Sequence, residues 1–255
     1  MKNTLIKAAL EAGKILKKNF GGTYKISSKD VVSNLVTEID KESETKIFEI
    51  IKKDFPGHYI LSEEAGALIK DSEYKWIIDP IDGTVNYAHS IPLTCVSIAV
   101  EKNGEIIMGA VYNPIFNEFF FSEKGKGAFL NDERISVSDC VDLKKSLLVT
   151  GFPYNSSRFK PDPVSVFKKF VLEDLPIRRL GSAALDLCWT ACGRFEGFWE
   201  YNLNPWDVAA GVLILEEAGG LITSLSGNEF SIYGKEILAV NNSVIQKSML
   251  SIIED

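Results

Sequence analysis

The first twenty residues place apolar side chains at helical spacing. One helix face would contain Leu5, Ala8, Ala9, Ala12, Ile15 and Leu16. The apolar pattern is interrupted by Lys7, Lys14, Lys17 and Lys18, whereas a signal peptide has an uninterrupted apolar centre. The pattern therefore predicts an amphipathic N-terminal helix rather than a signal peptide.

A second amphipathic helix is predicted over residues 41–54, and Pro56-Gly57 ends it. Asp40 is a plausible N-cap, because its carboxylate accepts hydrogen bonds from free N–H groups in the first turn. The inner face would contain Ile47, Ile50, Ile51 and Phe55. Between the two helices, residues 21–38 carry Gly and Ser pairs that are typical of a hairpin or a mobile loop.

The rest of the chain mixes strands and helices. Residues 94–114 predict a hairpin, because Asn103-Gly104 is a strong turn signal. Further on, helices are expected near 163–172, 182–192, 206–218 and from 243, with strands near 177–180, 197–200 and 236–241. This order predicts a layered α/β or α+β fold.

The composition excludes some classes of protein. The chain has 255 residues, of which 45% are hydrophobic and 25% are charged, as in soluble globular proteins. The net charge of −7 disfavours a general nucleic-acid binder. No apolar run reaches the ~20 residues that cross a bilayer. The four cysteines form no C-x-x-C pair, which predicts free thiols and a cytoplasmic location.

The segment Trp76–Tyr87 is the most informative part of the chain. An apolar strand, Trp76–Ile78, ends at Asp79-Pro80 and is followed by Asp82 and Gly83. Hard divalent cations prefer carboxylate and carbonyl oxygens, and a helix opening after Gly83 would offer free N–H groups to an anion. The segment thus predicts a Mg²⁺ site beside a phosphate. Taken separately, Asp-Pro and Asp-Gly are also ordinary turn pairs.

Other acidic residues stand at strand ends and helix starts, where chain ends converge in layered folds. They are Glu63, Glu64, Asp40, Asp207 and Glu200. Each has an ordinary explanation as a helix cap, a solvated loop residue or a surface charge. Gathered together they would repel one another unless cations were present. With only two histidines in the chain, zinc is disfavoured and Mg²⁺ or Mn²⁺ is favoured.

Three motifs resemble the inositol monophosphatase family. They are "SEE" at 62–64, "DPIDGTVNYAHSIP" at 79–92 and "NPWDVAAGVLILEEAGG" at 204–220. Weaker agreement, such as "LVTEID" at 35–40 and "GAVYNP" at 109–114, extends over most of the chain. The motifs depart from the family pattern at Ser62, Val85 and Tyr87, where Gly, Thr and Phe are common. Val85 leaves one hydroxyl fewer near the expected phosphate.

The resemblance implies an αβαβα sandwich of the inositol monophosphatase and fructose-1,6-bisphosphatase type. A single domain, 1–255, would have an α+β part about 1–145 and an α/β part about 146–255, with the active site between them. Family members are usually lithium-sensitive homodimers with up to three Mg²⁺ ions per site, and Mn²⁺ is a possible substitute.

The resemblance also assigns roles to individual residues. The metal ligands would be Glu63, Asp79, the Ile81 carbonyl, Asp82 and Asp207. Thr84 with Asp40 would position or deprotonate the attacking water, and Glu63 would help to hold a third ion. Contacts to the phosphate would come from Gly83 and Thr84, and contacts to the rest of the substrate from Ser182, Ala183 and Glu200. Lys29 would lie in a mobile loop that closes over the metals.

The expected activity is hydrolysis of a small phosphate monoester by metal-activated water, with inositol 1-phosphate as the first choice. Glu200 favours a neutral polyol over a second phosphate, although Arg178, Arg179 or Lys29 offer positive charge. Fructose 1,6-bisphosphate, histidinol phosphate and 3′-phosphoadenosine 5′-phosphate are alternative substrates. A regulatory binding protein associated with the transcription machinery is a rival function, and an α/β domain with scattered acids is a third.

Overall fold

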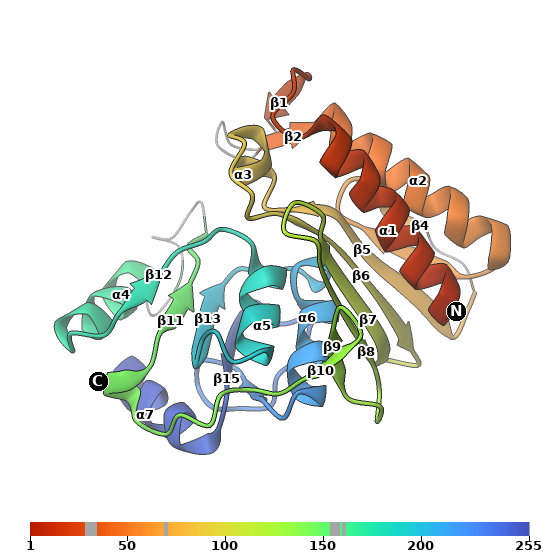
Figure 1. The fold of residues 1–255 in the computed structure, drawn as a ribbon. Coiled ribbons are helices and arrows are strands. Elements are labelled where there is room, and N and C mark those ends of the chain that lie inside the picture. The colour runs from red at the N-terminus through yellow and green to blue at the C-terminus, as the bar shows by residue number, and fades with distance from the viewer. Residues whose placement is uncertain (29–34, 69–70, 154–158, 160–161, 255) are drawn as a thin grey trace.

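The computed structural model describes residues 1–28, 35–68, 71–153, 159 and 162–254 (Figure 1). Lys29 and the loop assigned to it lie outside these residues. The chain folds into two β-sheets and three layers of helices. The expected αβαβα architecture is confirmed.

The first sheet has eight strands in the order β10-β9-β8-β7-β6-β5-β3-β4. All neighbouring pairs are antiparallel except β3 and β5, which are parallel. Its strands are β3 (Tyr59–Ser62), β4 (Gly66–Leu68), β5 (Tyr74–Asp82), β6 (Cys95–Lys102), β7 (Glu105–Asn113), β8 (Glu118–Glu123), β9 (Ala128–Leu130) and β10 (Glu133–Ile135).

The second sheet has five strands in the order β12-β11-β13-β15-β14. The strands are β11 (Leu148–Thr150), β12 (Ile177–Arg178), β13 (Gly197–Tyr201), β14 (Leu221–Thr223) and β15 (Glu236–Val240). A separate small hairpin joins β1 (Ile26–Ser28) to β2 (Leu35–Thr37). The short helix η1 (Leu143–Lys145) lies between the last strand of the first sheet and the first strand of the second.

Helices cover and separate the sheets (Figure 1). Helices α1 (Lys2–Asn19) and α2 (Glu38–Asp54) lie side by side on the outer face of the first sheet. Helices α5 (Ala183–Ala191) and α6 (Pro205–Glu217) fill the space between the sheets, and α4 (Pro163–Leu172) and α7 (Ser243–Glu254) cover the far face of the second. The short helix α3 (Thr84–Ala88) follows β5 directly.

Three apolar clusters hold these layers together. One joins α1 and α2 to the first sheet, and it includes Leu5, Ala12, Ile47 and Ile51 of the two predicted inner faces. The second surrounds α5 and α6, and the third lies under α4 and α7. Both long outer helices therefore bury the faces that the periodicity predicted.

Some predicted boundaries change for local reasons. Helix α2 begins at Glu38 rather than Lys41, because Thr37 is its N-cap. The prediction that Asp40 is the N-cap was therefore wrong: its carboxylate accepts the Thr37 N–H from the third helical position, as in a capping box. The predicted hairpin is confirmed, and Asn103 and Gly104 both have the positive φ that its tight turn requires.

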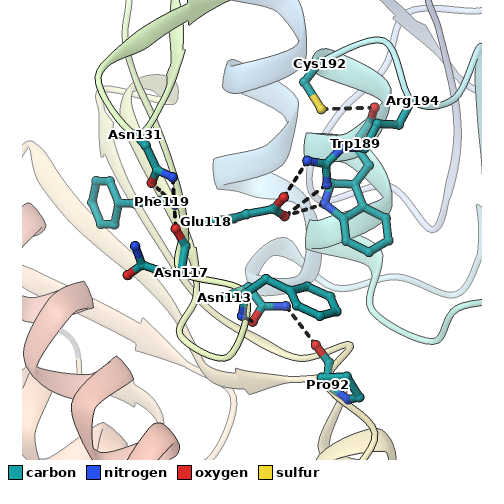
Figure 2. Close-up of polar contacts among 10 residues, drawn as sticks. Pro92, Asn113, Asn117, Glu118, Phe119, Asn131, Trp189, Cys192 and Arg194 are labelled. Atoms are coloured by element: carbon teal, nitrogen blue, oxygen red, sulfur yellow. Dashed lines mark hydrogen bonds and ion pairs between the residues drawn. The ribbon is translucent and has the colours of Figure 1, made fainter.

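Polar contacts tie the first sheet to the helices between the sheets (Figure 2). Glu118 on β8 accepts a hydrogen bond from the Trp189 indole, at 2.9 Å, and forms an ion pair with Arg194. The Arg194 guanidinium also stacks over the Trp189 ring. Nearby, the Asn113 amide donates to the Pro92 carbonyl at 2.9 Å, which anchors the segment after α3. The Glu118 contacts tie the C-terminal end of α5 to β8, and the Asn113 contact ties β7 to the segment after α3.

No helix among the described residues is long and apolar enough to cross a membrane. All four cysteines are free thiols, as expected, and Cys95 and Cys188 are buried. The division into parts near residue 145 stays a prediction.

Candidate active site

A β-bulge at the end of β5 brings two carboxylates to one face of the sheet. Asp79 pairs with Ser97 and Asp82 pairs with Cys95. The two aspartates are three residues apart in β5, whereas their partners are two apart in β6, so β5 contains one extra residue here. In a regular strand, residues three apart point to opposite faces. The extra residue cancels that alternation, because Ser97 and Cys95 share a face. The strand therefore extends to Asp82, beyond the predicted end at Asp79.

Local geometry fixes the turn that follows. Ile81 N–H donates to the Asp79 carboxylate at 3.0 Å, and the Ile81 carbonyl accepts the Thr84 hydroxyl at 2.9 Å. Gly83 has φ of 83°, and a Cβ there would lie 2.7 Å from the Leu93 carbonyl oxygen. Only glycine fits this position. Helix α3 starts directly after it, as the sequence predicts, with Thr84 at its first position.

The N-terminus of α5 holds one side of Asp82. Its Oδ2 accepts the Ser182 hydroxyl at 2.6 Å and the Ala184 N–H at 2.8 Å, with the Cys95 thiol at 3.8 Å. Three donors on one oxygen leave Oδ1 as the oxygen available to another ligand. Ser182 is 1% exposed and is occupied with Asp82, and its expected contact to substrate stays a prediction, as does that of Ala183.

Asp40 and Thr84 come together as the sequence predicts. The Thr84 hydroxyl lies 3.2 Å from Asp40 Oδ1, while Asp40 Oδ2 accepts the Thr37 N–H and hydroxyl at 2.8 and 2.6 Å. Asp40 is fully buried, whereas Thr84 is partly exposed. Burial raises the pKa of Asp40, the Thr37 hydrogen bonds lower it, and the charge of Glu63 raises it further.

Helix α6 presents Asp207 from its first turn. Asp207 Oδ2 accepts the Asn204 N–H at 2.7 Å in a second capping box, in which Asn204 is the N-cap. The Ser97 hydroxyl on β6 donates to the Trp206 carbonyl at 3.3 Å. Asp207 is therefore the third helical residue of a capping box rather than the N-cap, and the hydrogen bond from Asn204 also fixes the direction of its carboxylate.

Glu63 connects the acidic residues electrostatically. It follows β3, and its N–H donates to the Ile78 carbonyl of β5 at 3.1 Å. Burial raises the pKa of Asp79 well above its usual range, and the charges of Glu63, Asp82 and Asp207 add to this effect. Burial likewise raises the pKa of Asp207, and that of Asp82 to about 6, with Glu63 contributing to both.

The donor set fits hard divalent cations. The described part of the chain contains no group of three or more His, Cys, Asp and Glu side chains that could hold a metal ion as it stands. However, each of four carboxyls, Asp40, Asp79, Asp82 and Asp207, is destabilised in its charged form by burial and by Glu63. Divalent cations would remove this repulsion by drawing the oxygens together.

Glu200 lies near the carboxylates and rests against a glycine. It is the fourth residue of β13, and a Cβ on Gly151 would overlap its carboxyl group. Burial and the charge of Asp82 raise the pKa of Glu200 to about 8, while Arg179 lowers it. Gly151 was not predicted as a site residue, because a Gly before Phe-Pro is an ordinary turn signal.

Asp186 is a second residue that the sequence analysis missed. It lies on α5 and is 1% exposed, and neither carboxyl oxygen has a hydrogen-bond partner among the described residues. Burial and the charges of Glu200 and Asp82 raise the pKa of Asp186 well above its usual range. An acidic residue in the otherwise apolar helix "ALDLCWTA" is the signal that could have identified it.

Asp186→Asn is expected to stabilise the fold by about 1–3 kcal/mol at neutral pH, because it removes a buried carboxyl group whose ionisation is unfavourable in the folded state. The raised pKa means that the folded state holds the proton more tightly, so wild-type stability falls as pH rises above the unfolded value of ~3.9. The advantage of the variant should therefore be absent near pH 3 and grow at higher pH. Urea unfolding across pH measures it, and equal stability of both proteins at pH 7 would contradict it.

Comparison with known proteins gives a consistent result. The chain matches the inositol monophosphatase family over residues 1–255. It is 42% identical over 238 residues to the fructose-1,6-bisphosphatase/inositol-1-monophosphatase of Aquifex aeolicus, covering 93% of this chain and 89% of that protein. The Nus factor SuhB of Pasteurella multocida is 39% identical, with 97% and 93% covered. A solved inositol monophosphatase from Anabaena superposes with a TM-score of 0.87 at 42% identity, with 99% and 94% covered.

Proposed function

Because this chain belongs to the inositol monophosphatase family, we propose that it hydrolyses small phosphate monoesters with Mg²⁺, and that inositol 1-phosphate is its preferred substrate. The proposal is carried by one observation: the β5 bulge puts Asp79 and Asp82 on one face, within the electrostatic reach of Glu63 and Asp207. The family indicates a phosphatase, and the choice of substrate and the residue roles are our proposals.

Thr84 and Asp40 are placed to prepare the attacking water. The Thr84 hydroxyl is shared between Asp40 Oδ1 and the Ile81 carbonyl, so its oxygen can accept a hydrogen bond from water. Asp40 has a raised pKa and takes the proton that water loses, directly or through Thr84. The water oxygen then bonds to phosphorus, the phosphorus–ester oxygen bond breaks, and the leaving oxygen takes up a proton from solvent water, while Asp40 later returns its proton to solvent.

The proposed metal ligands are Glu63, Asp79, the Ile81 carbonyl, Asp82 and Asp207. When bound, Mg²⁺ supplies positive charge that lowers the pKa of water and neutralises phosphoryl oxygens. The protein's part is to hold one oxygen of each ligand in place, as Ser182 and Ala184 do for Asp82 and Asn204 does for Asp207. Gly83 and Thr84 would offer N–H groups to the phosphate at the start of α3.

Glu200 supports a polyol substrate. With a pKa of about 8 it accepts hydrogen bonds from substrate hydroxyl groups when ionised, and when protonated it can also donate one. Neither state has the positive charge that a second phosphate requires. Arg179 is the cation that would favour a bisphosphate instead, because its charge lowers the pKa of Glu200.

A substrate panel tests the proposal. With Mg²⁺ present, kcat/KM should be highest for inositol 1-phosphate among that ester, fructose 1,6-bisphosphate, histidinol phosphate and 3′-phosphoadenosine 5′-phosphate. Glu200→Gln should raise KM for inositol 1-phosphate about tenfold, which corresponds to the loss of one hydrogen bond worth about 1.4 kcal/mol. A higher kcat/KM for the bisphosphate would overturn the substrate choice. Absence of Mg²⁺-dependent turnover on all four would overturn the phosphatase itself.

Association with the transcription machinery is a second candidate, because one relative is named a Nus factor. Direct binding of the purified protein to a purified transcription complex, unchanged in a phosphatase-deficient variant such as Asp82→Asn, would support it. The two functions are compatible, since a surface contact need not involve the acidic site.

A further inference from the structure

Helix α2 turns three polar side chains toward the acidic site. Asp40, Ser43 and Glu44 occupy the i, i+3 and i+4 positions of one helix face, and each is buried. The same face continues into the apolar residues Ile47 and Ile51, which pack on the first sheet. Burying polar side chains costs free energy unless they form hydrogen bonds. The hydrogen-bond partners of these three residues therefore indicate why they are buried.

The three residues contact three different segments of the site. Asp40 accepts a hydrogen bond from Thr84, after the bulge. The Ser43 hydroxyl donates to the Pro80 carbonyl, between the two aspartates of β5, at 3.0 Å. Glu44 reaches the segment after β3, which carries Glu63. One helical turn therefore touches both segments of the first sheet that carry proposed metal ligands, the end of β5 and the turn after β3.

Glu44 closes the turn that contains Glu63. Its Oε1 accepts the Ser62 hydroxyl at 2.5 Å and the Ala65 N–H at 3.0 Å. These donors stand on either side of residues 63 and 64, so one carboxylate oxygen holds both ends of the turn. Glu44 is 8% exposed and Ser62 is fully buried, which protects the hydrogen bond between them from water, whereas Ala65 is exposed.

We propose that Glu44 is a positioning residue that sets the geometry of Glu63 for cation binding, with Ser62 as its main partner. The inference rests on the proposed Mg²⁺-dependent function. Glu44 touches neither substrate nor ion: it acts through the 62–65 turn.

The alternative is that Glu44 only stabilises the turn. In that case its loss would lower the melting temperature and the fraction of folded protein without changing the affinity of the folded protein for cations. A positioning role predicts instead that the cation affinity of the folded protein falls, because a displaced Glu63 binds the ion less well even when the protein is fully folded. Cation affinity thus separates the two roles.

The test compares Glu44→Ala, Glu44→Gln and Ser62→Ala with Glu42→Gln, an exposed control on the same helix. Mn²⁺ binding is measured by isothermal titration calorimetry, and the Mg²⁺ concentration for half-maximal turnover is measured beside it. Glu44→Ala should weaken Mn²⁺ binding and raise the Mg²⁺ requirement about tenfold or more, as for other outer-shell partners of metal ligands. Glu44→Gln keeps an acceptor oxygen, so its Mn²⁺ affinity and Mg²⁺ requirement should stay within about threefold of wild type. The values for Ser62→Ala should lie between those of the two Glu44 variants.

Two results would overturn the inference: wild-type Mn²⁺ affinity in folded Glu44→Ala, or a Gln variant as impaired as the Ala variant. If Glu44→Ala does not fold, Ser62→Ala decides, and unchanged Mn²⁺ affinity in that variant rejects the role. The calorimetric measurement needs no turnover, so a wild type that binds Mn²⁺ but hydrolyses nothing rejects only the proposed function. A wild type that binds no Mn²⁺ rejects both.

Discussion

Asp82→Asn is expected to lower kcat/KM by on the order of 10³-fold or more, with the fold intact. Oδ2 of Asp82 accepts hydrogen bonds from Ser182 and the Ala184 N–H. An amide has only one oxygen. If the amide oxygen accepts from Ser182 and Ala184, the NH₂ group takes the place of the oxygen proposed to bind a cation. If the amide is rotated the other way, the NH₂ group faces these two donors and cannot accept from them. Steady-state kinetics with inositol 1-phosphate measure the loss of kcat/KM, and a circular dichroism spectrum shows whether the fold is intact.

Ser182→Ala is the matched control for this prediction. It removes one donor but leaves both carboxylate oxygens, so the loss should be about 10–100-fold, as for other partners that orient metal ligands. A folded Asp82→Asn protein with normal Mg²⁺-dependent turnover would rule out Asp82 as a ligand. A loss in Ser182→Ala equal to that in Asp82→Asn would show instead that the hydroxyl itself contacts the substrate.

Asp40→Asn is expected to lower kcat by about 10²–10⁴-fold while leaving KM nearly unchanged, which is the usual contribution of a general base. The amide can still accept from Thr37 and complete the capping box, so the helix should begin at the same residue. It cannot take a proton from water. Stopped assays for released phosphate, at saturating substrate and Mg²⁺, measure the change.

Variants at Thr84 separate orientation of the water from proton transfer. Thr84→Ser keeps the hydroxyl that lies between Asp40 and the Ile81 carbonyl, and turnover should fall only a few-fold. Thr84→Val removes the hydroxyl at almost constant volume and should approach the loss seen in Asp40→Asn. Full activity in Thr84→Val would exclude Thr84 from the reaction, and unchanged kcat in Asp40→Asn would exclude Asp40 as the base.

Local sequence patterns determined the elements of this fold. The inner faces of α1 and α2 follow from apolar spacing, and the hairpin of β6 and β7 follows from Asn103-Gly104. Each depends on interactions among residues a few positions apart, which is why periodicity and turn chemistry predict them. The same holds for the identity of the acidic motif, whose residues are consecutive in the chain.

Tertiary structure decided how those residues act. No local pattern shows that a bulge turns Asp79 and Asp82 to one face, because the extra residue exists only relative to β6. Ser182 reaches Asp82 across 100 residues of sequence, and Glu44 reaches Ser62 across 18. The sequence supplied the acidic groups and their order. Which oxygens are held, and which are left for a ligand, depends on donors that only the packing of helices against sheets brings near, since a hydrogen bond requires contact in space and not proximity along the chain.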